Sequence, residues 1–512
     1  MVTLMVTFFK IIRFTFFNII FLFSVSVIAN SNALRSEGLA AFKEKLYPQA
    51  SLSFYKWSRQ AKTLAEKQEA KYFLGIALAK LDILQVATFP LVDVVRSGEG
   101  KYRKKALNQL ASFANALDEK GLLKFTIEKL TPEDLTDLSK SAFYINMSDI
   151  AYEEGQIDKA MSWAQMSLDA SPKNDEALYQ LASLALEKNK YPEALAYFSQ
   201  LLEKHKSKSP ADKKRGLATL NIARVYYQMK DWTKAAEFYR QVAKDHMDYR
   251  SALQELSWTL LRSAQLRSAL SPLQSLMTPF YSQFFDPETF VLSSSIYIFS
   301  CQFNEAYADA EAFEKNYQPT LNQIDTWLKG SRTADDFYNE LSKAQKSLEN
   351  LNKTGKIESQ GLLPFFVLRT IMTEPDIQSG LKYLKRMENE LLKLKANFPE
   401  SPFMEYAKKI LKGRSLAAKR KLARAVEFYL KSYWVKTTDI ADQIGFIKYE
   451  ALNGQRMQLK EKMMVDARQT VDGDLNRGYY AQNGYRYWPF EGEFWRDEIG
   501  SFQYVGISRC QK

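Results

Sequence analysis

Apolar and small residues recur along this 512-residue chain with a period close to 34. The copies that begin at Gly155 and Asn189 show the period best, because Ala160 and Ala194 stand 34 positions apart. Other copies repeat a large residue followed three positions later by an alanine: Tyr47 and Ala50, Trp232 and Ala235, Leu266 and Ala269, Phe303 and Ala306. A period of this length predicts an array of repeated supersecondary units.

Each copy has the pattern of two helices joined by a short turn. The first half of one copy, ALYQLASLALEK before Lys190, has the apolar spacing of an amphipathic helix. The second half opens with the large residue and its alanine. The small side chain lets the two helices approach closely, and the large one fills the gap beside it. The pattern therefore predicts an all-α array of helix–turn–helix units.

This pattern resembles the tetratricopeptide repeat (TPR), a helix–turn–helix unit of 34 residues. The resemblance is good over residues 142–315 and weaker over 34–130. The small residue of the first helix is glycine at Gly38 and Gly75 but serine or alanine later. Pro172 ends one unit as the family pattern requires, whereas other units lack that proline. Residues 204–215, KHKSKSPADKKR, lengthen one connection.

The resemblance implies an α-solenoid with a concave groove. One hairpin cannot bury its apolar face alone, so hairpins stack and their first helices line the groove. Aromatic and arginine side chains are good anchors for a protein partner. The groove-facing candidates are Tyr179, Arg224, Tyr227, Trp258 and Arg262. The alternative is that some of these rings pack between repeats.

The period fades over residues 316–470, while helical spacing persists. One apolar stripe ends before Pro399 and Pro402, with lysine and glutamate opposite: Leu381, Leu384, Met387, Leu391, Leu394 and Phe398. A second long helix carries a basic cluster near its start: Arg414, Lys419, Arg420, Lys421 and Arg424. We expect a solvated helix face there, with contact to an anionic surface as the alternative. These helices are expected to cap the stack.

The last segment, 471–512, combines glycine with many aromatic residues, as in YRYWPFEGEFWRDEIGSFQY from Tyr485. Because ring surface seeks burial, we expect an aromatic clasp that covers the end of the stack, with Trp488, Phe490 and Trp495 in it. Recognition of another protein is the alternative. The segment also resembles the tails of periplasmic TPR proteins of myxobacteria and related predatory bacteria. That resemblance implies a scaffold subunit of an envelope assembly, some of which serve gliding motility.

Residues 1–33 have the pattern of a secretory signal peptide. Lys10 and Arg13 precede an apolar run, and the small residues after it predict cleavage following Ala33 or Ala29. An uncleaved membrane anchor is the alternative, although the run is short for a span of about 20 residues. The expected location is the periplasm. There the only two cysteines, Cys301 and Cys510, would form a disulfide or remain unpaired thiols.

Composition fits a folded helical protein. Hydrophobic residues make up 46% of the chain and charged residues 25%, and 20 glycines are few for a chain of this length. The net charge of +12 suits weak contact with an anionic membrane or glycan surface. Nucleic acid is not an expected partner, because no recognition fold accompanies the charge and the signal segment directs the chain to secretion.

The sequence offers no convincing active site. His205 and His246 fall in polar connections without a cysteine or carboxylate at ligand spacing, so neither a metal nor a cofactor is expected. Phosphate loops and nucleophile elbows are absent from the sequence. Glu358 and Ser359 are similar to the catalytic pair of lytic transglycosylases, in which a buried glutamate donates a proton. The Gly-Leu-Met-Gln type segment of that family is missing, so Glu358 is expected to be an ordinary helix-start or loop residue.

The sequence therefore predicts a secreted, all-α scaffold that binds other envelope proteins and is not an enzyme. Two alternatives remain: a peptidoglycan-acting enzyme of the lytic transglycosylase type, and a membrane-anchored assembly factor.

Overall fold

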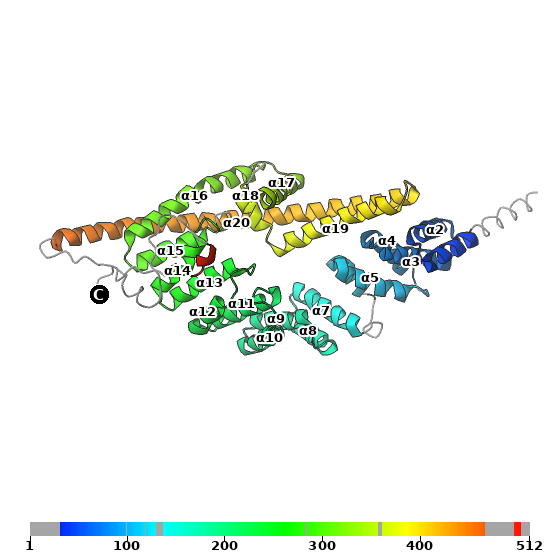
Figure 1. Ribbon diagram of the computed structural model, residues 1–512, viewed down its shortest axis with the longest axis horizontal. Helices are drawn as coiled ribbons and strands as arrows, with labels where there is room; N and C mark the ends of the chain where they lie inside the picture. The colour runs from blue at the N-terminus through cyan, green and yellow to red at the C-terminus, as the bar shows by residue number, and fades with distance from the viewer. Residues whose placement is uncertain are drawn as a thin grey trace, which may run out of the picture. The chain divides into compact units, whose positions relative to one another are not determined.

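A computed structural model describes residues 31–98, 100–117, 119–127, 129, 137–281, 284–356, 361–465 and 496–502. Within these ranges the regular elements are helices and there is no strand, which confirms the all-α prediction (Figure 1). The described helices do not include one with both the length and the apolar character that crossing a bilayer requires. The predicted signal segment up to residue 30 lies outside the described residues.

The chain divides into two compact units. Unit 1 comprises Met1–Lys173 and Ser379–Lys421, and unit 2 comprises Asn174–Gln378 and Leu422–Lys512. Each unit is described by itself below. The helix from Pro402 to Val465, α20, contributes its first part to unit 1 and the remainder to unit 2.

Unit 1 consists of helical hairpins followed by two longer helices. A helix over residues 31–43 precedes α2 (Tyr47–Gln60), α3 (Leu64–Lys80), α4 (Leu84–Arg96), α5 (Arg103–Leu117), α6 (Lys120–Ile127), α7 (Asp137–Glu153) and α8 (Ile157–Ala170). Most of α19 (Pro375–Asn397) and the start of α20 complete the unit. Helices that follow one another from α2 to α5 pack together, as do α7 and α8.

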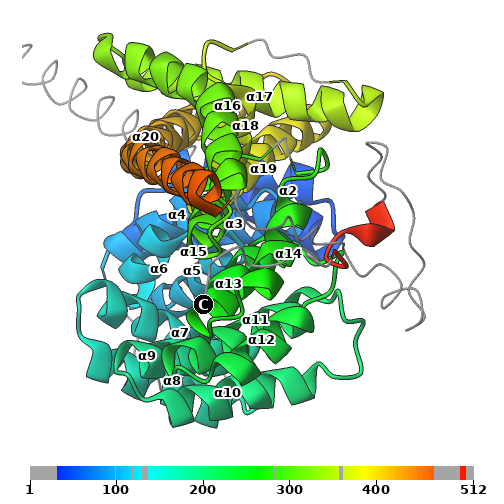
Figure 2. The same ribbon diagram turned by 90° about the vertical axis from the view of Figure 1, so that its left-hand side faces the viewer.

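Unit 2 contains four further hairpins and a helical extension. Its elements are α9 (Asp175–Glu187), α10 (Tyr191–Lys204), α11 (Lys213–Gln228), α12 (Trp232–Arg240), α13 (Tyr249–Arg262), α14 (Leu266–Leu276), α15 (Glu288–Phe299), α16 (Phe303–Lys329), α17 (Ala334–Thr354), α18 (Phe365–Ile371), the later part of α20 and the short helix η2 (Arg496–Glu498). Consecutive helices from α9 to α16 pack against each other, and two views show α11, α12 and α13 side by side (Figures 1 and 2).

The same turn joins the two helices of most hairpins. In the hairpin of α9 and α10, the amide of Lys190 donates to the carbonyl of Ala185 at 2.8 Å, and the amide of Asn189 donates to that of Leu186 at 2.8 Å. This pair of bonds satisfies carbonyls that a helix end leaves unpaired, and it needs one left-handed residue. Residues with positive φ occupy that position in seven hairpins: Lys45, Asp82, Gly155, Asn189, Lys230, Ala264 and Cys301. Because these hairpins share one turn conformation, the second helix leaves the first in the same direction in each of them.

A buried alanine marks the closest approach in each of these hairpins. Seven equivalent alanines are 0% exposed: Ala50, Ala87, Ala160, Ala194, Ala235, Ala269 and Ala306. A side-chain carbon added to Gly75 of the facing helix would lie 2.6 Å from Leu91. Where serine replaces that glycine, its hydroxyl forms a hydrogen bond to the facing helix. For example, Ser257 Oγ donates to the carbonyl of Ala269 at 2.7 Å. The close helix contact predicted from the alanines is confirmed.

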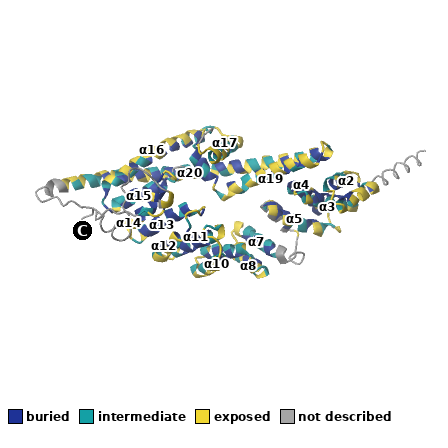
Figure 3. Ribbon diagram, viewed as in Figure 1, coloured by how far each residue is buried: buried dark blue, intermediate teal, exposed yellow. Residues whose placement is uncertain are grey.

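The predicted apolar stripe of α19 is also confirmed, with one correction. Leu384, Met387, Leu394 and Phe398 are buried, and Figure 3 shows buried and exposed residues alternating along the helix. Glutamates were expected on the opposite face, yet Glu390 is only 5% exposed. Its carboxylate accepts from the backbone amide of Gln85 at 2.9 Å, at the start of α4. Burial raises the pKa of Glu390 to about 7.

The sequence predicted a solvated face for the basic cluster on α20, and this is wrong for Arg414. Arg414 points inward, and its side chain is 16% exposed. The guanidinium donates to the Glu119 carboxylate at 2.8 Å, to Tyr383 Oη at 3.0 Å and to Thr88 Oγ1 at 2.9 Å, and it also contacts the Gln85 amide oxygen. The helix starts at Pro402 rather than near Arg414, so Arg414 lies inside the helix instead of at its start.

Replacing Arg414 should destabilise unit 1 specifically. In Arg414→Met, the Glu119 carboxylate and the Tyr383 hydroxyl lose their shared partner, and we expect the free energy of unfolding to fall by about 3 kcal/mol. Arg420→Met, in an exposed position of the same helix, is the matched control. Urea unfolding followed by circular dichroism measures both variants. Equal stability of the two would contradict the internal role of Arg414.

Part of the C-terminal segment packs onto unit 2. Ile499 is 5% exposed and belongs to the core cluster built by α11 to α15. The amide of Gly500 donates to Ser275 Oγ at 2.8 Å, and Lys244 Nζ donates to the carbonyl of Asp497 at 2.8 Å. A side-chain carbon on Gly500 would lie 1.9 Å from Tyr249 Oη, so only glycine fits. This part of the tail therefore docks on its own chain.

The described tail contacts α13 and α14 rather than the end of the stack, where the sequence analysis placed it. Gly500 fits between these helices because Ser275 accepts from its backbone amide and Tyr249 Oη lies close to its α-carbon. The predicted anchors Trp488, Phe490 and Trp495 lie outside the described residues. Cys301 is disulfide-bonded. Cys510, its predicted partner, lies outside the described range.

Removing the Ile499 side chain tests how firmly the tail is docked. Ile499→Ala should lower the free energy of unfolding by about 2 kcal/mol, because a buried aliphatic side chain is lost from the core. Asp497→Ala is the control, since that side chain is exposed and only its backbone carbonyl is used. If thermal unfolding cannot distinguish the two variants from wild type, the tail does not contribute to the core.

Candidate functional site

A cavity of about 580 Å³ opens in unit 2 beside three successive hairpins. It lies at the C-terminal halves of α9, α11 and α13, the first helices of those hairpins. Its lining residues are Leu186, Glu187, Asn189, Tyr191, Arg224, Tyr227, Gln228, Tyr239, Glu255 and Trp258. The stacking of equivalent helices brings together side chains that are about 30 residues apart in sequence.

Arg224 is held by an ion pair inside this cavity. Its guanidinium makes two bonds to Glu255, from Nε to Oε2 at 2.9 Å and from Nη2 to Oε1 at 2.6 Å. The hydrogen bonds with Glu255 raise the pKa of Arg224. Burial and the neighbouring Glu255 carboxylate raise the pKa of the Tyr239 hydroxyl. Both oxygens of Glu255 are thus used within the protein.

Trp258 is likewise fixed by its polar atom. The indole Nε1 donates to Glu288 Oε1 at 3.0 Å, and Glu288 Oε2 accepts from Lys436 Nζ of α20 at 2.8 Å. The indole nitrogen is therefore occupied, and Trp258 lines the cavity with its polar atom already paired. Tyr227 packs edge-on against Trp232 with ring centroids 5.1 Å apart. Aromatic rings held in this way present rigid apolar surface.

The structure gathers three of the five predicted groove residues. Arg224, Tyr227 and Trp258 line the cavity. Tyr179 is half-buried against Phe198 with ring centroids 5.8 Å apart, and Arg262 is exposed; neither lines the cavity. Tyr179 thus packs against the second helix of its own hairpin, since Phe198 lies on α10.

Sequence reasoning missed the partners that orient the predicted residues. Glu255 follows Arg224 by 31 residues, and Glu288 follows Trp258 by 30. A separation close to the repeat length indicates that two residues occupy equivalent positions on neighbouring hairpins and can face each other. Opposite charges at such a spacing would have indicated the Arg224 ion pair.

A second exposed apolar surface runs along the part of α20 in unit 2. Phe428, Val435, Phe446 and Met457 are 51–66% exposed. They are separated by 7, 11 and 11 residues, close to whole numbers of helical turns, so they share one face. Exposed apolar surface of this kind is typical of interaction sites.

The described residues do not assemble a metal centre. Within them, no group of three histidine, cysteine or acidic side chains is arranged to hold a metal ion. His205 Nε2 lies 3.0 Å from Asp175 Oδ2, a carboxylate distant in sequence, and His246 is 4% exposed beneath Gly216. The carboxylate beside His205 could not be predicted from local spacing, because Asp175 lies on another helix. Glu358 and Ser359 lie outside the described residues.

Comparison with known proteins identifies the repeat. Residues 175–244 match the TPR family. A TPR protein from Parabacteroides merdae is 14% identical and covers 49% of this chain and 93% of its own, with a TM-score of 0.32. The structure of pilF from Pseudomonas aeruginosa is 15% identical and covers 44% of this chain and 97% of its own, with a TM-score of 0.32. The apo form of RapI is 13% identical and covers 71% of this chain and 98% of its own, with a TM-score of 0.34. No curated protein matches the sequence.

The matched residues run from the start of α9 to just beyond α12, and they supply most of the cavity lining. The match of residues 175–244 to the TPR model confirms the resemblance seen in the 34-residue period. Repeats of this family indicate a scaffold for protein–protein interaction.

Proposed function

We propose that this chain is a non-enzymatic scaffold of the cell envelope, and that its cavity on α9, α11 and α13 receives an apolar side chain from a partner protein. The observation that carries the proposal is the cavity itself, in which the polar atoms of Arg224 and Trp258 are already paired. A partner carboxylate would compete with Glu255 for Arg224. An aliphatic or aromatic side chain would instead bury ring faces without breaking any bond.

The envelope location rests on separate observations. Residues 1–33 have the pattern of a signal peptide, and the disulfide at Cys301 fits an oxidising compartment such as the periplasm. A role in motility rests on the resemblance of the tail alone. The partners are proposed to be other envelope proteins, with weak contact between exposed basic residues such as Arg420 and Arg424 and an anionic surface.

Shortening the cavity rings tests the function. Tyr227→Ala and Trp258→Ala should weaken capture of envelope partners at least tenfold, because aromatic anchors in desolvated pockets contribute about 2 kcal/mol or more to binding. Tagged full-length chain is used to capture proteins from separate envelope and cytosolic extracts of the source cells, with quantification by mass spectrometry. Circular dichroism checks that the variants fold.

Arg262→Ala is the matched control, because Arg262 is exposed on α13 but does not line the cavity. It should retain every partner that wild type captures. Retention of all partners by Tyr227→Ala and Trp258→Ala would remove the cavity from the function. Partners found only in the cytosolic extract would contradict the envelope location.

A further inference from the structure

The connection between α10 and α11 is longer than the repeat requires. Ala194 and Ala235 are 41 positions apart, whereas Ala160 and Ala194 are 34 apart. The seven extra residues bury nothing, because no residue from 202 to 215 is buried. Neighbouring hairpins stack without such an insertion, so the core does not account for it.

This connection nevertheless has one defined shape. Arg215 Nη1 donates to the carbonyls of Lys206 at 3.1 Å and Lys208 at 2.6 Å, which ties the loop to the start of α11. Asp212 Oδ1 accepts from the amides of Lys214 and Arg215, both at 3.1 Å, and caps that helix. A surface held in place before binding loses less conformational entropy when a partner docks.

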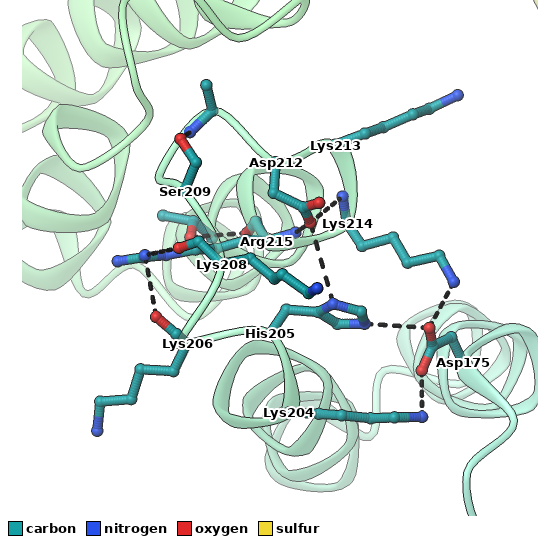
Figure 4. Close-up of polar contacts among 12 residues, drawn as sticks. Asp175, Lys204, His205, Lys206, Lys208, Ser209, Asp212, Lys213, Lys214 and Arg215 are labelled. Atoms are coloured by element: carbon teal, nitrogen blue, oxygen red, sulfur yellow. Dashed lines mark hydrogen bonds and ion pairs between the residues drawn. The ribbon is translucent and has the colours of Figure 1, made fainter.

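Cationic groups converge on a single carboxylate beside the connection (Figure 4). Asp175, at the start of α9, accepts from Lys214 Nζ at 2.5 Å, lies 3.0 Å from His205 Nε2 and also pairs with Lys204. Burial works against ionisation, but the three hydrogen-bonding partners outweigh it and lower the pKa of Asp175 to about 2. The other histidine nitrogen, Nδ1, lies 3.9 Å from Asp212 Oδ1. Asp175 therefore keeps the cations together without cancelling their charge.

Positive charge remains in excess after these pairings. Six basic residues, Lys204, Lys206, Lys208, Lys213, Lys214 and Arg215, face three acidic ones, Glu203, Asp175 and Asp212, which leaves +3 with His205 neutral. Lys208 and Lys213 are exposed and form no ion pair with the residues that the structure describes. In Figure 4, Lys206 and Lys213 extend away from Asp175. Lys208 and Lys213 therefore present unpaired amines to an approaching partner, and Lys206, which is paired with the exposed Glu203 at 3.1 Å, lies beside them.

We propose that this basic connection, residues 204–215, is a second docking surface and that it binds an acidic segment of a partner protein. It adjoins the N-terminal ends of α9 and α11, whereas the cavity lies at their C-terminal halves. A membrane fits less well, because the segment carries no large apolar side chain to insert. A nucleic acid fits less well because the segment has no Phe, Tyr or Trp on which a base could stack, and its imidazole, on His205, is held against Asp175.

A labelled peptide tests the proposal on the full-length chain. The probe is a fluorescein-labelled decapeptide of glutamate, and its binding is followed by fluorescence anisotropy. The triple variant Lys206→Gln, Lys208→Gln, Lys213→Gln should bind about tenfold more weakly than wild type, since each exposed ion pair contributes about two- to fivefold. Raising sodium chloride from about 50 to 300 mM should weaken wild-type binding similarly.

The matched control removes the same charge elsewhere in unit 2. Lys346→Gln, Lys353→Gln, Lys356→Gln neutralises three exposed lysines in and just after α17 and should change binding less than twofold. Equal loss in both triple variants would show that net charge alone binds the peptide, and would overturn the proposal. Binding of phosphatidylglycerol vesicles that is lost only in the first variant, without binding of the peptide, would assign the surface to a membrane and also overturn it.

Discussion

The close contact between the two helices of each hairpin is the constraint on which the rest of the structure depends. An alanine with no exposed surface stands at that contact in hairpins of both units, and the facing residue is glycine, alanine or serine. Larger side chains would hold the helices apart and open the interior. Because the left-handed turn fixes the direction of the second helix, each hairpin presents an apolar face that only a neighbour can cover.

This packing explains the chemistry of the cavity in unit 2. Equivalent first helices stand next to each other, so Arg224 meets Glu255 and Trp258 meets Glu288, each one repeat away. These internal pairs satisfy the polar atoms of the side chains that line the cavity. A site of this kind discriminates partners by the shape of an apolar side chain, whereas the basic connection would add discrimination by charge.

The sequence predicted those features that depend on local spacing. The 34-residue period led to the hairpins, the buried alanines, and Arg224, Tyr227 and Trp258 in the cavity. Features made by distant segments were missed. Arg414 was assigned to solvent because Glu119 and Thr88 lie far away in sequence, and Glu390 was assigned to the polar face because its partner is the start of α4. Likewise, only the fold brings Asp175 beside His205 and Lys214.

The stability of Ala235→Leu tests the central constraint most directly. Ala235 is 0% exposed between α11 and α12, and Thr233→Leu, at an exposed position on α12, is the matched control. Urea unfolding should show that Ala235→Leu lowers the free energy of unfolding by about 2 kcal/mol, because the added carbons overfill the contact, while the control changes it little. Equal stability of Ala235→Leu, the control and wild type would contradict the account.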